Sequence, residues 1–287
     1  MIDNKKVDAL IRLLDDRDDE IFQHIESELF SFGEQVIEPL EQAWESSLDS
    51  LLQERIENLI HKIQFTIVLK DLELWHISGS FDLLQGLLIV NRYQYPDLDE
   101  QKIINQIEEI KREIWMQMIY KMNPVEKVRL VNTVLFTNFG FSGNTKRYHD
   151  PQNSYLSQVL ETKKGNPILL ASIYSIIAQK LDMSIYGINL PRHFILAYTD
   201  DYDTNAEENE VLFYINPFNK GQVFGKHDVL SFLKQLNLPA DPAYFQPCTN
   251  VEIIARVIRN LMSSYEQNAM DDKVQELKKM LNLIDPG

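Results

Sequence analysis

The sequence predicts an α+β protein in which one buried helix packs against a small antiparallel sheet. Residues 168–181 are apolar on nearly every face of a helix, so we expect this helix to be buried on all sides. Two runs rich in β-branched and aromatic residues follow it, 184–190 and 193–198, with Pro191 and Arg192 at their junction. Such runs are typical of strands, and His193 would begin the second. Helical patterns fill most of the chain on either side.

Local signals define the start of the central helix. Lys163 and Lys164 suit the last turn of a preceding helix, and we expect Gly165 at the left-handed position just past it. Asn166 is a good N-cap, and Pro167 is preorganised for the first helical position. One helix therefore ends and the next begins within these five residues.

The chain divides into three predicted parts: a helical segment at 1–70, the α+β core at 71–246 and a helical hairpin at 247–287. In the first part, the apolar positions of 21–32 recur about thirty residues later. Helix pairs of this kind resemble HEAT-type repeats, whose apolar faces need a neighbour. We expect them to dock on the core, as a structural cap or with a groove for a partner.

The hairpin of the last part consists of two amphipathic helices, 250–267 and 271–283, with Asn250 as the expected N-cap of the first. It resembles a single tetratricopeptide-type hairpin, and we expect it to dock on the core or cap it.

Further elements complete the predicted core. Helices are expected at 80–93, 99–122, 125–138 and 228–238, and strands at 211–215 and 221–224. Five large side chains are expected to fill the core: Trp75, Trp115, Met116, Met118 and Met122. The acidic segment 199–210 is expected to be a solvated loop between strands.

Composition narrows the possible functions. The 287 residues are 44% hydrophobic and 25% charged, as in soluble globular proteins. A net charge of -15 disfavours binding to nucleic acid or to an anionic membrane surface. No signal peptide or membrane-spanning run is recognisable, so we expect a cytoplasmic protein. Oligomeric state is left open.

The sequence predicts neither a metal site nor a cofactor. A single cysteine, Cys248, rules out an intrachain disulfide and a cysteine-based zinc site. His149 beside Asp150 lacks a third ligand nearby in sequence. The acidic loop at 199–210 begins like an EF-hand, but Ala206 stands where the sharp turn needs Gly and Leu212 where the bidentate Glu belongs.

The order of elements, a central helix followed by strands with His and Asn at corresponding positions, resembles the transglutaminase-like superfamily. Five motifs carry a narrower similarity to the bacterial SirB-type family: FGFSGN, DPQNSYLSQVLE, KKGNPILLASIYSIIAQKL, NLPRHFILAY and INPF. The resemblance extends over residues 71–224, more than half of the chain. It implies a papain-like core with a cleft at the start of the central helix.

The resemblance also implies the positions of a catalytic triad. The family's nucleophilic Cys, its His and its Asp correspond here to Pro167, His193 and Asn216. Asn can orient a His, as in Cys-His-Asn sites, but proline has neither a nucleophilic atom nor a backbone donor. Cys248 lies just before a predicted helix and is interpreted as a bystander thiol. We further expect five residues to line the cleft: Tyr148, Asn153, Lys164, Asn166 and Arg192.

Arg192 stands where the SirB-type pattern has Gly, so it should narrow the cleft and make its mouth positive. Two functions remain. The first is a catalytically inactive protein- or peptide-binding or scaffold module that keeps the cleft for recognition. The alternative is a papain-like hydrolase or acyl-transfer enzyme that uses another nucleophile, with His193 as base and Asn216 as its orienter.

Overall fold

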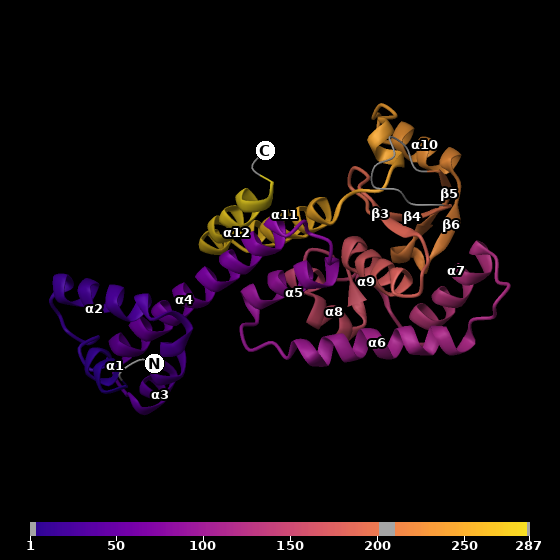
Figure 1. The fold of residues 1–287 in the computed structure, drawn as a ribbon. Coiled ribbons are helices and arrows are strands. Elements are labelled where there is room, and N and C mark those ends of the chain that lie inside the picture. The colour runs from indigo at the N-terminus through magenta and orange to yellow at the C-terminus, as the bar shows by residue number, and fades with distance from the viewer. Residues whose placement is uncertain (1–3, 201–209, 286–287) are drawn as a thin grey trace. The chain divides into compact units, whose positions relative to one another are not determined.

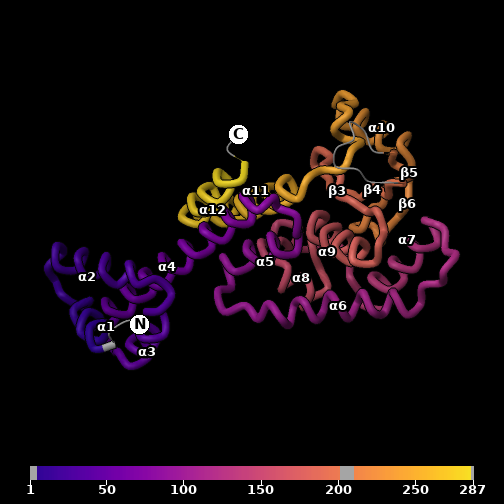
Figure 2. The backbone as a smooth tube through the Cα atoms, in the orientation of Figure 1, coloured from indigo at the N-terminus to yellow at the C-terminus, as the bar shows by residue number. Residues whose placement is uncertain are grey.

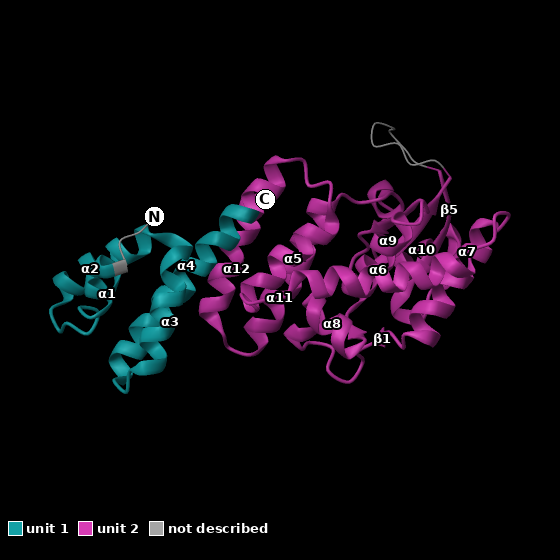
Figure 3. Cartoon of the chain, turned by 60° about the horizontal axis from the view of Figure 1, so that its bottom comes forward, with its two compact units in different colours: residues 1–71 teal, residues 72–287 magenta. Residues whose placement is uncertain are grey.

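The computed structural model describes residues 4–200 and 210–285 (Figure 1). The chain forms two compact units, Met1–Asp71 and Leu72–Gly287, which Figure 3 colours separately. The predicted acidic loop falls largely on residues 201–209, outside the described residues.

The first unit is helical and has its own apolar core. It contains α1 (Asn4–Ile11), α2 (Asp19–Ser31), η1 (Gly33–Val36), α3 (Ile37–Ser46) and the larger part of α4 (Ser50–Ile77). The two segments of the predicted repeat contribute to the same core, for example through Leu29 and Ile56, which are fully buried. Their HEAT-like character stays a prediction.

The second unit begins in the last turns of α4 and contains most of the chain. Its helices are α5 (Leu83–Gln94), α6 (Glu100–Gln117), α7 (Pro124–Asn132), α8 (Leu156–Thr162), α9 (Pro167–Gln179), α10 (Lys226–Gln235), α11 (Asn250–Gln267) and α12 (Asp271–Ile284). A π-helical stretch, η2 (Thr133–Asn138), continues α7, and single turns form η3 (Pro151–Ser154), η4 (Pro217–Asn219) and η5 (Pro242–Phe245).

Helix α9 is the centre of this unit, as predicted. Every residue from Pro167 to Ala178 is buried. The helix contacts α5, α6, α8 and α11 as well as strands β3 and β4 (Figure 1). Asn166 caps it and Pro167 opens it, which confirms both local predictions.

The sheet lies between α9 and α10. Its antiparallel strands are β3 (Ile185–Ile188), β4 (Ile195–Thr199), β5 (Val211–Asn216) and β6 (Gln222–Phe224), in that order (Figure 2). Because side chains alternate along a strand, β4 can pack on helices on both faces. Ile195 and Ala197 join Val229 and Leu233 of α10 in a second apolar cluster. A separate short pair, β1 (Ser142–Gly143) and β2 (Lys164–Gly165), is parallel, and β2 directly precedes α9.

The C-terminal hairpin belongs to the same unit as the core and is held by tyrosines. Helix α11 contacts α5, α9 and η3. The hydroxyls of Tyr155 and Tyr265 lie 2.9 Å apart, and the Tyr93 hydroxyl donates to Glu276 of α12 at 2.9 Å. Burial raises the pKa of Tyr155 well above its usual value, so its contact with the hydroxyl of Tyr265 is made by a neutral phenol.

Three local predictions were wrong. Lys163, not Gly165, takes the left-handed position after α8, with φ of 59°. Gly165 instead lies in β2, where a Cβ would come within 2.9 Å of Val159. His193 precedes β4 by two residues rather than beginning it. The N-cap of α11 is Thr249, whose capping box with Glu252 replaces the expected cap at Asn250.

The expected core role was confirmed for Trp75 but was wrong for Trp115 and Met116. Trp75 is buried, but Trp115 is 67% and Met116 60% exposed. The buried face of α6 is set by isoleucines three or four residues apart, ending at Ile110 and Ile114. At 100° per residue, the two positions that follow Ile114 turn away from that face. Met118 and Met122, in the loop after α6, are partly buried.

Replacing Ile173 with Asp tests the burial of α9. Ile173 is 1% exposed, and Ile173→Asp would place an unpaired charge in the core, so we expect a loss of about 4 kcal/mol in the free energy of unfolding. Ile77→Asp is the control, because Ile77 is 73% exposed. Urea unfolding measures both, and an unchanged midpoint for Ile173→Asp would contradict this environment for the helix.

Candidate functional site

The start of α9 is closed by a network of buried amides. The Asn166 Oδ1 accepts the Leu169 N–H at 3.0 Å, and its Nδ2 donates to the Ser154 hydroxyl at 2.7 Å. The Asn166 N–H donates to the Asn153 carbonyl at 3.3 Å. Asn166, predicted to line a cleft, is thus committed to capping the helix. Pro167 is buried beside it and offers no atom for covalent chemistry.

Two aromatic side chains cover the strand pair next to this helix start. Turn η4 contacts both α9 and β1, so it lies at the N-terminal end of α9. A Cβ at Gly143 would come within 2.5 Å of the Phe218 ring, which therefore lies directly on β1. The rings of Phe218 and Tyr148 meet edge to face, with centroids 6.1 Å apart. Sequence reasoning named Tyr148 but missed Phe218, although it stands within the INPF motif.

His193 and Asn216 lie together, as the resemblance implied. The Asn216 Nδ2 is 3.1 Å from the His193 Nε2. Asn216 ends β5, and His193 belongs to the tight turn before β4, where its N–H donates to the Leu190 carbonyl at 3.2 Å. Arg192 in this turn has φ of 60°, in the left-handed region that Gly adopts most readily. The Gly of the SirB-type pattern would fit this conformation without strain.

The second contact of Asn216 fixes the direction of this hydrogen bond. Its Oδ1 accepts the Asn219 N–H at 3.2 Å, so its Nδ2 must face the imidazole. An amide nitrogen only donates, so the His193 Nε2 accepts and the proton of the neutral ring lies on Nδ1. Neither ring nitrogen then has a free lone pair to take a proton from a nucleophile. In a Cys-His-Asn site the amide oxygen accepts from the ring instead.

The surroundings of His193 favour its neutral form. Burial lowers the pKa of His193, and the nearby Arg256 guanidinium lowers it further. Arg256, on α11, donates to the Leu190 carbonyl at 2.7 Å, which places it against the same turn.

An apolar pocket opens beside this polar pair. It has a volume of about 300 Å³, and its polar lining residues are Arg192, His193, Asn216 and Asp228. Its apolar walls include Phe232 of α10 and Leu236, the C-cap of that helix, and the rings of His193 and Phe232 have centroids 5.9 Å apart. We call this the His193 pocket. An apolar cavity with a few convergent polar groups is the usual form of a small-ligand site.

A second, polar pocket of about 300 Å³ lies beside η3 and β2. It contains two of the predicted cleft residues, Asn153 and Lys164, together with the cations Lys146 and Arg147. Neither pocket includes Pro167 or Tyr148 in its lining. The residues expected along one cleft therefore separate into a helix cap, an aromatic cover and two pockets.

Cys248 does not take over the nucleophile position. Its N–H donates to the Gly187 carbonyl at 2.8 Å, and burial raises the pKa of its thiol to about 12. A thiol with that pKa is almost entirely protonated at neutral pH and hence a poor nucleophile. Cys248 lies outside the lining of the His193 pocket.

Among the residues that the structure describes, no three or more His, Cys, Asp or Glu side chains are grouped so that they could hold a metal ion. None of the described helices combines the length and apolar character that a membrane crossing needs.

These features define a transglutaminase-like core whose helix start carries proline. The family profile described as "Transglutaminase-like superfamily" matches residues 101–259, more than half of the chain. The chain belongs to the transglutaminase-like superfamily, which confirms the broader of the two resemblances.

The curated relatives include proteins from several bacteria and a longer eukaryotic protein. A UPF0162 protein of Xylella fastidiosa (strain Temecula1 / ATCC 700964) is 30% identical over 209 residues, covering 68% of this chain and 70% of the relative. A UPF0162 protein of Vibrio cholerae is 24% identical over 188 residues, 64% and 67% of the two chains. F-box only protein 21 of Homo sapiens is 25% identical over 162 residues, covering 53% of this chain and 24% of that protein. No solved structure matches.

The neutral form of His193 predicts how stability depends on pH. Because the pKa of His193 is lowered below 6.5 in the folded protein, the unfolded chain takes up this proton first as the pH falls. The contribution of His193 to stability is therefore complete above its unfolded pKa and is lost as the pH falls through its folded pKa. His193→Gln cannot titrate and should show a weaker loss. Urea midpoints across this range measure the difference, and parallel curves for the two proteins would contradict the assignment.

Proposed function

We propose that this protein is a catalytically inactive member of the transglutaminase-like superfamily that recognises a polypeptide. The observation that carries the proposal is Pro167 at the helix start, where the chemistry of the superfamily needs a thiolate. The hydrogen bond from Asn216 to His193 supports it, because it leaves the imidazole without a free lone pair. Cys248, with a pKa of about 12, offers no replacement nucleophile.

The site of recognition in this proposal is the His193 pocket. Its volume of about 300 Å³ and its apolar walls suit one large apolar side chain. The polar groups at its edge, Arg192, His193 and Asp228, are placed to hydrogen-bond the peptide backbone beside that side chain. Recognition needs these groups to bind and orient, and it needs no bond to break.

The proposal also covers the family branch, the cellular compartment and the surfaces for protein partners. We place the chain in the SirB-type branch on its five motifs, in the cytoplasm, with the N-terminal HEAT-like helices and the tetratricopeptide-like hairpin as scaffold surfaces for protein partners. The match to a segment of F-box only protein 21 supports a modular role, since the matched segment forms only 24% of that protein.

A variant that fills the pocket tests the recognition site. Leu236→Trp places a larger apolar group in the lining, whereas Leu230→Trp adds the same group on α10 outside the lining, at a position that is 39% exposed. We expect N-acetyl-phenylalanine amide and N-acetyl-leucine amide to shift the ring resonances of His193 saturably in the wild type and in Leu230→Trp. Leu236→Trp should weaken this binding about tenfold or more.

Three outcomes separate the possibilities. Saturable shifts that Leu236→Trp removes support the pocket. Shifts unchanged by Leu236→Trp, or no saturable shift with either probe, contradict recognition at this pocket. Release of ammonia from either probe by the unmodified protein, leaving the N-acetyl amino acid and lost in His193→Ala, would favour the alternative of a hydrolase.

A further inference from the structure

The end of α6 and the loop after it form an exposed apolar surface. Trp115 is 67%, Met116 60%, Ile119 71% and Tyr120 99% exposed. These four residues line one groove of about 710 Å³, between the end of α6 and the end of α9. We call it the Trp115 groove. Large exposed apolar clusters on a protein surface usually mark an interaction site, so we expect this one to be covered by a partner.

The groove is held in place by ordered structure on both sides. Ile114, next to Trp115, is fully buried and anchors the last turn of α6. The loop then passes into α7 through a capping box, in which Asn123 accepts the Glu126 N–H at 3.0 Å and Glu126 accepts the Asn123 N–H at 2.8 Å. The aromatic side chains are thus presented from a fixed frame, which lowers the entropic cost of binding.

The edges of the groove carry positive charge. Lys111, Lys127 and Lys180 line it, and Asp182 is the one acidic residue in the lining. Together with Glu108, which pairs with two of these lysines, the local charge is +1. The chain as a whole has a net charge of -15, so the groove and the whole protein carry charges of opposite sign.

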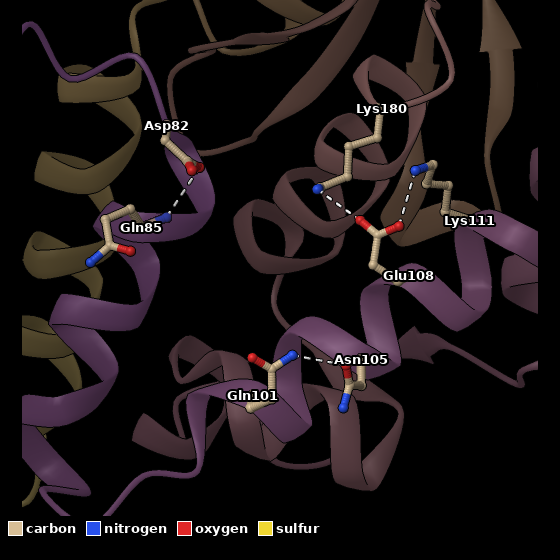
Figure 4. A network of polar contacts seen from close by, with 7 residues as sticks. All are labelled: Asp82, Gln85, Gln101, Asn105, Glu108, Lys111 and Lys180. Carbon is tan, nitrogen blue, oxygen red and sulfur yellow. Dashed lines mark hydrogen bonds and ion pairs between the residues drawn. The ribbon is translucent and has the colours of Figure 1, made fainter.

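Two of these lysines are fixed by one carboxylate (Figure 4). The Lys180 Nζ is 2.8 Å from one oxygen of Glu108, and the Lys111 Nζ is 3.0 Å from the other. This bridge joins α6 to the end of α9 and holds both ammonium groups at the groove. The hydrogen bonds from Lys180 and then from Lys111 lower the pKa of Glu108, so the bridge stays ionised at neutral pH.

These charges select among possible occupants. In a symmetric dimer the same patch meets itself, which would place the three lysines of one groove against those of the other. Nucleic acid would meet the repulsion of the whole acidic chain. A protein segment with apolar side chains and carboxylates on one face complements both the aromatic lining and the lysines. Trp, Tyr and Met are also among the residues that are enriched in protein interfaces.

We propose that the Trp115 groove is a docking site for an acidic, amphipathic segment of a partner protein. The groove and the His193 pocket have no lining residue in common, so this proposal does not depend on the proposed function. The apolar face of the segment covers Trp115 and Tyr120, and its carboxylates meet the lysines.

Fluorescence anisotropy with designed peptides tests the proposal on the full chain. The probe is a fluorescein-labelled helical peptide with leucines on one face and glutamates beside them. One comparison peptide has lysine for every glutamate, and another has serine for every leucine. We expect saturable binding of the acidic amphipathic probe alone, weakened by salt. Trp115→Ala and Tyr120→Ala should each weaken it about tenfold or more, and Lys127→Glu should slow association.

Phe81→Ala is the matched control, because Phe81 is 88% exposed but lies outside the groove lining. It should leave binding unchanged, and all these surface variants should keep the wild-type melting temperature. Absence of saturable binding, or equal weakening by Phe81→Ala, would overturn the proposal. A concentration-dependent dimer in sedimentation that Trp115→Ala abolishes would overturn it in favour of self-association.

Discussion

The buried start of α9 is the constraint on which the larger unit depends. A helix with no side open to water must have its free N–H groups satisfied by protein, because an unpaired buried donor costs about 1–3 kcal/mol. Asn166 meets one of these donors, and Pro167 removes another by having no N–H. Ser154 in turn fixes the Asn166 amide. The sheet, α6 and the C-terminal hairpin then pack around this one helix, so its start cannot shift without disturbing several layers.

The same helix start explains the chemistry of the site. A thiol there would be activated by the helix dipole, whereas Pro167 strengthens the helix and leaves nothing to activate. His193 and Asn216 are in hydrogen-bond contact, but Asn216 donates to the His193 Nε2 because its oxygen is held by the turn η4. The imidazole is therefore positioned as a hydrogen-bonding group at the edge of an apolar pocket. This arrangement supports recognition in place of acyl transfer.

Sequence reasoning succeeded where local chemistry decides the structure. The apolar run of α9, its Asn-Pro start and the β-rich runs after it are properties of neighbouring residues, and the structure confirms them. It failed where packing between elements decides the structure. Gly165 is required by packing against Val159 rather than by a left-handed conformation, and Phe218 covers β1 through a turn far along the chain. The exposure of Trp115 depends on which face of α6 meets the core, and composition does not reveal this.

Restoring the thiol tests the central claim, that this site is not arranged for acyl transfer. Pro167→Cys places a thiol at the helix start, which is the nucleophile position of the superfamily. The decisive measurement is hydrolysis of a chromogenic peptide anilide by Pro167→Cys and by the unmodified protein. We expect that neither protein hydrolyses the anilide, because His193 has no free lone pair. Hydrolysis by either protein that disappears in the corresponding His193→Ala variant would contradict it.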